Sequence, residues 1–303
     1  MIKRTICIEN PCHLKCRNDQ LVLNYEGIRG LEQVPEKTVP VEDIGIVVLD
    51  HQQITVSHFL LDRLLQNNAA VITCNATHHP NGMLLNLDGN TVQSERFRVQ
   101  IEASEPLKKQ LWQQTVRAKI QNQCRLLERL KLPAETLKNY AEKVRSGDAD
   151  NLEARAAGYY WQYLFPPTWK FFRKRDGPPP NNLLNYGYAI LRATVARALV
   201  GSGLLPTLGI FHRSRYNAFC LADDVMEPYR PFVDSVVRGI IDRTSNIETL
   251  TSELKVELLR IPALDVQLKG ETSPLFVAVQ RTSASLARCF LGQEKKILYP
   301  RFP

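Results

Sequence analysis

The spacing of apolar residues changes once along this chain, near residue 96, and this change limits the folds that the chain can adopt. Before it, short segments rich in Val, Ile and Thr alternate with Pro, Gly, Asn and Asp, which is typical of strands and turns. The expected strands are 4–10, 21–27, 44–50, 53–57 and 70–75. Leu residues at helical spacing in segment 58–68 add one helix. We therefore expect a small, mainly β N-terminal domain over residues 1–95.

After residue 96 the apolar residues recur every three or four positions, which indicates amphipathic helices. The first and longest spans about 107–130 and ends before Pro133, and we assign basic residues, Lys119 among them, to its polar faces. Further helices are expected at 134–146, 149–165, 182–201, 216–241 and 247–258. The predicted fold class is α+β, in which a larger, all-α C-terminal domain covers residues 96–303.

Composition excludes several classes of protein. The 303 residues are 44% hydrophobic and 23% charged, and no apolar run approaches the ~20 residues of a membrane span. The N-terminal residues are not expected to form a signal peptide, and the seven Cys are an odd set in mostly apolar surroundings. The segment "CHLKC" at 12–16 is not followed by a second Cys pair at zinc-site spacing. We expect a soluble protein of the reducing cytoplasm.

The charge is divided unequally between the two expected domains. Residues 1–95 hold 7 Lys and Arg against 11 Asp and Glu, whereas residues 96–303 hold 32 against 20, within a total of +8. A basic C-terminal domain favours a polyanionic partner, most often nucleic acid. A solvated basic surface that only maintains solubility is the alternative, and charge alone leaves it open.

The segment "IFHRSRYNAFCLADDVMEPYRP" at 210–231 places charged residues among apolar ones. Asp224 and Glu227 are three apart, and Asp223 and Glu227 four apart, so either pair can share a helical face. Pro228 is expected to end or kink that helix. His212 follows a connection punctuated by Gly and Pro, so it is expected in a loop or at a helix start. A satisfied histidine of the core is the alternative.

Glu153 is a second carboxylate in apolar company. Asp148 or Asp150 can cap its helix, and on that helix Glu153 shares a stripe with buried-type residues such as Tyr160. An unpaired carboxylate facing packed side chains is costly. Either an Arg such as Arg155 or a bound cation could compensate it, and the local sequence leaves both possibilities open.

One imidazole and two carboxylates together can form an open site for Mg²⁺ or Mn²⁺. Arg213, Arg215 and Arg230 lie close in sequence to His212 and Glu227. Such a site would suit a phosphodiester, because the cation polarises a phosphoryl oxygen while Arg side chains bind the flanking phosphates.

The segment "WKFFRKR" at 169–175 mixes aromatic and basic residues. Its four basic residues are expected to contact DNA phosphates while the neighbouring rings pack on bases or sugars. They are Lys170, Arg173, Lys174 and Arg175. An amphipathic turn whose aromatic rings belong to the core is the alternative.

Three blocks of this sequence resemble one known family. They are "LEARAAGYYWQYLF", "NNLLNYGYAILRATVARALVGSGLLPTLGIFHRS" and "LADDVMEPYRPFVD". In this order they are similar to the CRISPR-associated integrase, the catalytic subunit of the spacer-acquisition complex, and "DVMEPYRP" resembles the members of type II systems. The resemblance covers the whole chain and implies a small β domain, with dimerisation and partner contacts, before a larger helical domain that carries catalysis and DNA binding.

The resemblance also implies the site residues. Glu153, His212 and Glu227 match the family's metal ligands and are the expected catalytic residues, with Mg²⁺ or Mn²⁺ as cofactor. Asp224 matches a secondary acidic position that lies at the site, and Asp223 matches nothing diagnostic.

The implied activity is that of a metal-dependent DNA integrase and endonuclease of CRISPR adaptation, which serves antiviral defence. A 3′-hydroxyl of the spacer precursor would attack a phosphodiester at the repeat. The implied assembly is a homodimer that joins a small ferredoxin-like adaptation subunit in a heterohexamer, without a membrane. The alternatives are a metal-dependent nuclease acting on branched DNA or RNA, and a non-catalytic nucleic-acid-binding scaffold.

Overall fold

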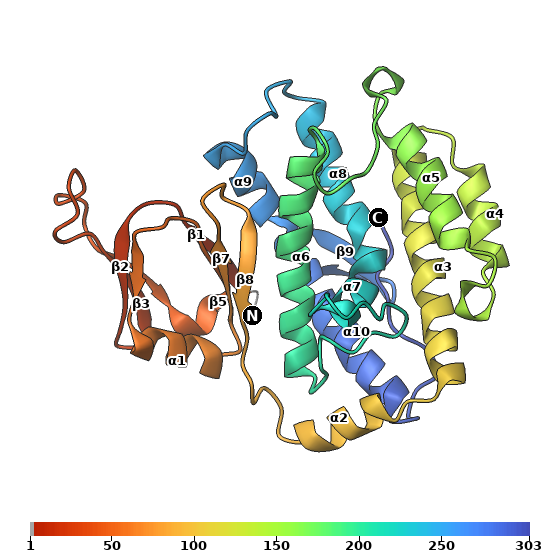
Figure 1. The fold of residues 1–303 in the computed structure, drawn as a ribbon, viewed down its shortest axis with the longest axis horizontal. Coiled ribbons are helices and arrows are strands. Elements are labelled where there is room, and N and C mark those ends of the chain that lie inside the picture. Colours follow the sequence, from red (N-terminus) through yellow and green to blue (C-terminus); the bar gives the residue numbers. More distant parts are fainter. Residues whose placement is uncertain (1–2) are drawn as a thin grey trace. The chain divides into compact units, whose positions relative to one another are not determined.

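The computed structural model describes residues 3–303 and divides the chain into two compact units, the first ending at Gly89 and the second covering Asn90–Pro303 (Figure 1). The predicted α+β class is confirmed, with a β-sheet unit followed by a mainly helical one. Helix α2 (Gln93–Ile101), which the periodicity did not indicate, belongs to the second unit. The change from strands to helices therefore falls a few residues earlier than the sequence pattern placed it.

The first unit contains two four-stranded sheets. One has the order β1-β5-β7-β8, in which the first three strands are parallel and β8 is antiparallel. Its strands are β1 (Arg4–Ile8), β5 (Ile44–Leu49), β7 (Ala70–Cys74) and β8 (Pro80–Leu84). The other has the order β4-β3-β2-β6. Its strands are β4 (Lys37–Pro40), β3 (Gln20–Asn24), β2 (Cys12–Arg17) and β6 (Ile54–Val56).

Helix α1 (His58–Gln66) lies on the same hydrophobic core as the sheets, as its Leu spacing predicted. Its buried side chains are Leu60 and Leu64. The segment "CHLKC" forms strand β2, in which Cys12 and Leu14 are buried and His13 is exposed. This alternation is that of an ordinary strand, so Cys12, His13 and Cys16 are strand residues and not ligands gathered around a zinc ion.

The second unit is built from helices that the sequence largely anticipated. They are α3 (Glu105–Arg129), α4 (Glu135–Lys143), α5 (Leu152–Leu164), α6 (Asn181–Gly201), α7 (Cys220–Met226), α8 (Arg230–Ile241), α9 (Ser252–Leu259) and α10 (Leu275–Phe290). Helix α6 is buried along most of its length and packs against α7, α8, α9 and α10. Of the residues described, no helix combines the length and apolarity needed to cross a membrane.

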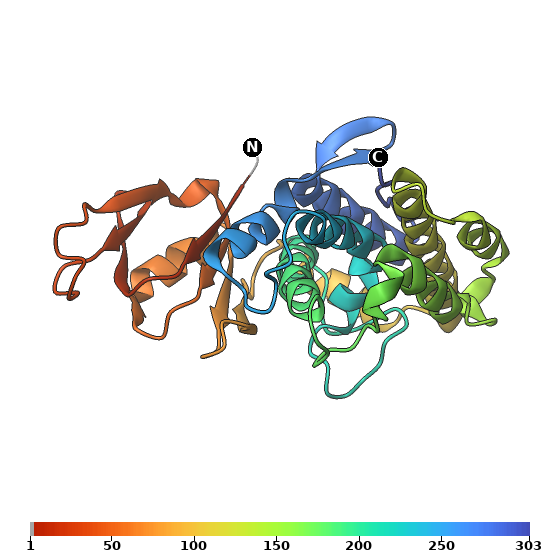
Figure 2. The same ribbon diagram turned by 90° about the horizontal axis from the view of Figure 1, so that it is seen from above.

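One feature of the second unit departs from an all-helical domain. Strands β9 (Asp265–Leu268) and β10 (Glu271–Pro274) form an antiparallel hairpin that packs beside α10 (Figure 2). Lys269 and Gly270 connect them with positive φ angles, as a two-residue hairpin turn requires. The hairpin is too short and too polar in β10 to stand out from the sequence.

Helix α3 buries more polar residues than its apolar stripe suggests. Lys119 is only 7% exposed, so its assignment to a polar face is wrong. The reason is visible in the spacing, because Lys119 follows Trp112 by seven residues and Val116 by three, which places all three on one face. Helix α3 packs against α5 and against the 3₁₀ turn η4 (Glu227–Tyr229), so this face is directed at two of the expected site residues.

Candidate active site

One lysine contacts both expected glutamate ligands. The Nζ atom of Lys119 forms ion pairs with Oε1 of Glu153 and, at 2.6 Å, with Oε2 of Glu227. Burial alone would lower the pKa of Lys119, but the two carboxylates outweigh it and raise that pKa above its usual range. A single ammonium group from the middle of α3 therefore holds together two carboxylates that are far apart in sequence.

Glu153 reaches this position because Asp148 fixes the start of α5. The carboxylate of Asp148 accepts hydrogen bonds from the backbone N–H groups of Leu152 and Glu153, both at 2.9 Å. Of the two expected caps, Asp148 is the one used, since Asp150 pairs with Arg145 instead.

Arg155, one of the two compensations considered for Glu153, is engaged elsewhere. Its guanidinium lies over the ring of Tyr140, 4.9 Å from the ring centroid. The compensating cation seen in the structure is instead Lys119, so the suggestion of Arg155 as the partner is wrong.

Glu227 lies at a break between two helices. Helix α7 ends at Met226, Pro228 lies in the short 3₁₀ turn, and α8 begins at Arg230, as the proline predicted. Arg230 Nε donates to Glu227 Oε1 at 2.8 Å, so both carboxylate oxygens of Glu227 contact cations. Burial alone would raise the pKa of Glu227, but Arg230 and Lys119 hold it at about 2. Glu227 is therefore a buried, ionised carboxylate.

His212 lies in the loop between α6 and α7, as expected, and a buried acid orients it. Its Nδ1 atom is 2.5 Å from Oδ1 of Asp224, and the other carboxylate oxygen, Oδ2, accepts a hydrogen bond from the backbone N–H of Phe211 at 2.9 Å. The hydrogen bond with Asp224 is the main reason why the pKa of His212 is raised. With Nδ1 engaged, Nε2 is left as the ring nitrogen that can bind a cation.

The side chain of His212 is 45% exposed, so it is not a histidine of the core. Its loop is anchored by the ring of Phe211, which stacks on buried Trp112 with centroids 4.4 Å apart. Asp224 is completely buried and contacts His212, while its expected place at a catalytic site stays a prediction. Asp223 instead pairs with Arg192 at 2.7 Å and accepts from Asn217.

The donor chemistry of these residues fits a hard divalent cation. Two carboxylates and one imidazole offer oxygen and nitrogen ligands of the kind that Mg²⁺ and Mn²⁺ accept. The position between Glu153 and Glu227 already attracts a positive group, the ammonium of Lys119. The donor atoms of Glu153, His212 and Glu227 are not all within 4.8 Å of one another in the described residues, so cation binding requires these side-chain ends to draw together.

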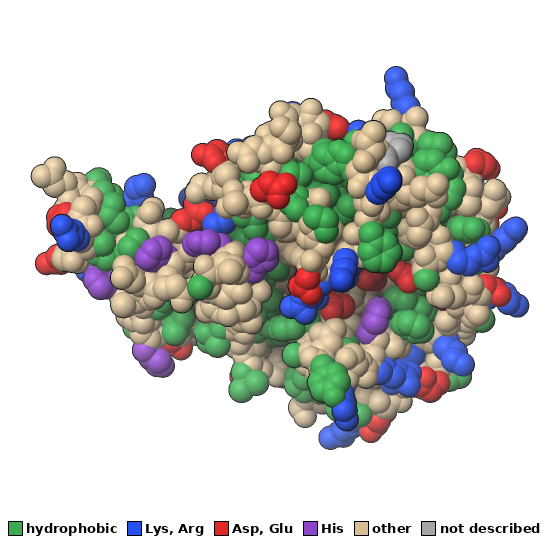
Figure 3. Space-filling model, turned by 45° about the horizontal axis from the view of Figure 1, so that its top comes forward, with side chains coloured by type: hydrophobic (Ala, Val, Ile, Leu, Met, Phe, Trp, Pro, Cys, Tyr) green, Lys and Arg blue, Asp and Glu red, His purple; other side chains and the backbone are tan. Residues whose placement is uncertain are grey.

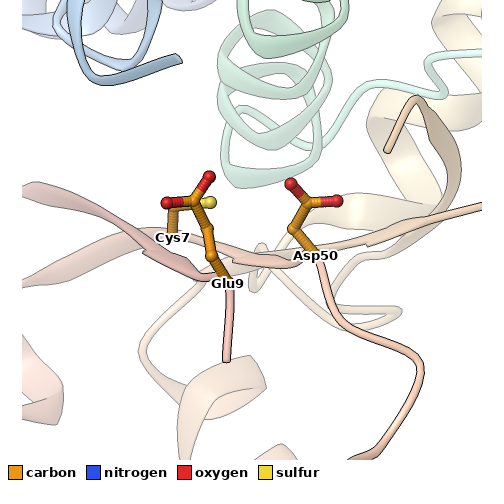
Figure 4. A group of neighbouring side chains, drawn as sticks. All are labelled: Cys7, Glu9 and Asp50. Atoms are coloured by element: carbon orange, nitrogen blue, oxygen red, sulfur yellow. The ribbon is translucent and has the colours of Figure 1, made fainter. Parts of the chain in front are cut away.

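Within residues 3–303 the three donors that do meet this limit are Cys7, Glu9 and Asp50 in the first unit (Figure 4). They lie in β1 or directly after β1 and β5. Asp50 also faces His78, with Oδ1 at 3.0 Å from its Nδ1. All three have further interactions within the protein, so we assign no metal site to them.

The basic residues expected to contact DNA fall into two groups. Arg173 and Arg230 are held internally: Arg173 donates to Asn181 and Asn185 at 2.9 and 2.7 Å, and both guanidinium groups lie over the ring of Tyr188. The other five are exposed at the surface. They are Lys170, Lys174, Arg175, Arg213 and Arg215.

Two of the five exposed residues have partners on the surface. Arg213 pairs with Glu105 at 2.5 Å, and the guanidinium of Arg215 lies over the ring of Tyr216. Such exposed contacts are weak and exchange readily with other partners.

A groove of about 880 Å³ begins at Glu153 and continues along α5 to the aromatic and basic segment. Its lining includes Gly158, Trp161, Lys170 and Phe172. Phe172 is 76% exposed, whereas Phe171 packs against Phe165, so the aromatic rings of this segment divide between surface and core. Figure 3 shows a hollow in the larger unit around which acidic, basic and histidine side chains gather.

Two buried residues near the site were missed from the sequence. Lys119 could have been found from its place on the apolar face of α3. Asp234 on α8 accepts hydrogen bonds from the hydroxyls of Tyr160, at 2.8 Å, and of Tyr188. Burial is the main reason why the pKa of Asp234 is raised to about 6. No local pattern distinguishes Asp234 from the exposed acids of other helices.

The chain is similar to known proteins over most of its length. The family described as "CRISPR associated protein Cas1" matches residues 6–253. The chain is 35% identical over 287 residues to "CRISPR-associated endonuclease Cas1" of Neisseria meningitidis serogroup C (strain 8013). The aligned region covers 94% of this chain and 91% of the relative.

Two solved structures share the fold. A "Casposase bound to integration product" superposes with a TM-score of 0.78 at 18% identity, covering 98% of this chain and 92% of the other. A chain of the "Cas6-RT-Cas1--Cas2 complex" superposes with a TM-score of 0.73 at 20% identity, covering 98% of this chain and 36% of the other.

Proposed function

Because the chain belongs to the Cas1 family of CRISPR-associated proteins, we propose that it is a metal-dependent DNA integrase and endonuclease of spacer acquisition. A 3′-hydroxyl of a short DNA duplex attacks a phosphodiester at the CRISPR repeat, so that a new phosphodiester forms while the bond from phosphorus to the 3′-oxygen of the attacked strand breaks and that oxygen leaves as a 3′-hydroxyl. The family match and the similarity to the Neisseria endonuclease support the activity. The meeting of Glu153 and Glu227 at one cation position supports the site.

In this proposal the carboxylates of Glu153 and Glu227 and Nε2 of His212 hold a Mg²⁺ or Mn²⁺ ion. When bound, such an ion polarises a phosphoryl oxygen and stabilises the charge that develops during transesterification. Asp224 keeps the imidazole in position through Nδ1, and the break at Pro228 turns Glu227 toward α3.

The groove gives the DNA strand a path to Glu153 at the proposed cation site. Its exposed basic residue Lys170, with Lys174 and Arg175 in the same segment, neutralises phosphates, and the exposed ring of Phe172 stacks on a base. Arg213 and Arg215 lie in the loop of His212 and can exchange their surface partners for phosphates.

The proposed assembly is a homodimer bound to a small ferredoxin-like subunit in a heterohexamer. One structural neighbour, the Cas6-RT-Cas1--Cas2 complex, supports a protein partner for this chain. Another, the casposase bound to an integration product, supports DNA as a partner. We assign dimerisation and partner contacts to the β-sheet unit.

The observation that carries the proposal is the ion-pair bridge of Glu153, Lys119 and Glu227 at the end of a groove that contains basic and aromatic residues. The test is a joining reaction with the small subunit, Mn²⁺, a labelled duplex with free 3′-hydroxyls and a repeat-containing target. We expect Glu153→Gln to lower the yield of joined strands by at least ~10²-fold, the scale of losing a direct transition-state contact, while DNA binding is retained.

Glu142→Gln is the matched control, because Glu142 is an exposed glutamate on α4 of the same unit. Nicked products without any joined strands would favour a nuclease of branched DNA or RNA. Equal losses of folding and joining in Glu153→Gln would favour a non-catalytic scaffold.

A further inference from the structure

The two carboxylates of the proposed cation site are already matched by two cations of the protein. Lys119 contacts both Glu153 and Glu227, and Arg230 contacts the second oxygen of Glu227. Besides these three ion pairs, His212 lies against Asp224, and the charges of this pair also cancel when the imidazole is protonated. The centre is therefore close to neutral before any ion from solution arrives.

These two cations are difficult to move into water. The side chain of Lys119 is 9% exposed and that of Arg230 is 23% exposed. Arg230 is fixed by Glu227 on one side and by the ring of Tyr188, 4.6 Å from its guanidinium carbon, on the other. A divalent cation that entered this region would therefore add positive charge next to buried positive charge, which is unfavourable at low dielectric.

A phosphodiester supplies the missing negative charge. The groove is lined by Glu153, so a strand that lies in it brings a phosphate to this glutamate, whose carboxylate pairs with Lys119. A phosphate there gives the ammonium of Lys119 an alternative acceptor, so that carboxylate oxygens become available to the cation.

We propose that Lys119 is a positioning residue that makes divalent-cation binding depend on a DNA phosphodiester. Without DNA its ammonium occupies the position between Glu153 and Glu227, and with DNA it releases carboxylate oxygen to the cation. This inference rests on the proposed function, because it assigns the same site to a cation and DNA. Linkage requires the reverse effect as well, so the cation raises the affinity for DNA by the same factor.

The experiment measures Mn²⁺ binding to the full-length protein from the electron paramagnetic resonance signal of free Mn²⁺. The probe is a short DNA duplex whose 3′ ends are dideoxy-terminated, so that no reaction occurs. For the wild type we expect the duplex to increase the affinity for Mn²⁺ about tenfold, within the usual range of coupled sites.

Lys119→Met removes the charge and keeps the length of the side chain. We expect this variant to bind Mn²⁺ about tenfold more tightly than the wild type when DNA is absent, and to lose most of the effect of DNA. Lys119→Arg keeps the positive charge and should restore the dependence on DNA. Lys109→Met is the matched control, since Lys109 is an exposed lysine of the same helix, and it should behave as the wild type.

A lysine that only stabilises the fold would give a different result. Lys119→Met would then lower thermal stability without tightening Mn²⁺ binding, and this outcome would overturn the inference. Equal Mn²⁺ affinities of the wild type with and without DNA would also overturn it. This comparison uses the wild-type protein alone, so it does not depend on whether a variant folds. If the wild type joins strands in the presence of Mn²⁺ but shows no coupling, only the inference fails. If it neither binds Mn²⁺ nor joins strands, the proposed function fails.

Discussion

Glu227 and Asp234 are buried carboxylates seven residues apart, and their surroundings give them opposite properties. Glu227 contacts Lys119 and Arg230, which hold its pKa at about 2. Asp234 accepts hydrogen bonds from Tyr160 and Tyr188, and burial raises its pKa to about 6. Because both acids are buried, the charge of their partners decides that Glu227 is held ionised, as a cation ligand must be, while Asp234 is a structural hydrogen-bond acceptor.

The largest expected difference between the two acids is in catalysis. Glu227→Gln should lower the rate of strand joining by at least ~10²-fold, because it removes a charged ligand from the proposed cation site. Asp234→Asn should keep that rate within about threefold, because asparagine still accepts from a tyrosine hydroxyl and no ligand is lost. Gel analysis of joined products measures both rates under identical conditions, and similar losses in the two variants would break the comparison.

The next difference is in the pH dependence of stability. The folded pKa of Asp234, about 6, lies above its ordinary value of 3.8, so the folded state keeps a proton that the unfolded chain has already lost. The free energy of unfolding should therefore fall as the pH rises from about 4 to 6 and then level off, by on the order of 3 kcal/mol. Asp234→Asn should lack this decrease.

Urea unfolding of both proteins at a series of pH values provides the measurement. The difference between wild type and Asp234→Asn isolates this one group, because the other titrating residues are shared. Parallel curves for the two proteins would contradict the assignment of the raised pKa to Asp234. For Glu227 the sign is reversed, since its lowered pKa gives stability that is present above about pH 4.5 and lost toward pH 2.

The smallest expected effect concerns Asp224, a third buried carboxylate, whose partner is His212. Asp224→Asn should weaken Mn²⁺ binding about tenfold, because an acid that holds the second ring nitrogen of a histidine ligand typically contributes this amount to metal affinity. Its effect on DNA binding without metal should be negligible, because Asp224 is buried beneath the loop. Titration with Mn²⁺ checks the first expectation, and an unchanged affinity would show that Asp224 does not position His212.

Much of the fold followed from local patterns. The change in periodicity separated the β-sheet unit from the helices, and Pro228 marked the break between α7 and α8. Asp148, one of the two residues expected to cap α5, does cap it. Such features are predictable because helix ends and strand alternation depend on residues within a few positions. The β9–β10 hairpin was not predictable, because its stability comes from packing on α10 rather than from its own sequence.

The sequence by itself determined the type of most helices and of strands β1, β3, β5, β6 and β7, but not of β2, β4, β8 or α2, and Pro228 marked the break at which Glu227 faces α3. Through resemblance it also indicated Glu153, His212 and Glu227 as the site residues, which stays a prediction. Only the tertiary structure decided that Lys119, and not Arg155, compensates Glu153 and reaches Glu227 as well. The physical reason is that a buried ion pair between distant residues depends on how α3, α5 and η4 pack together, and no local pattern records that packing.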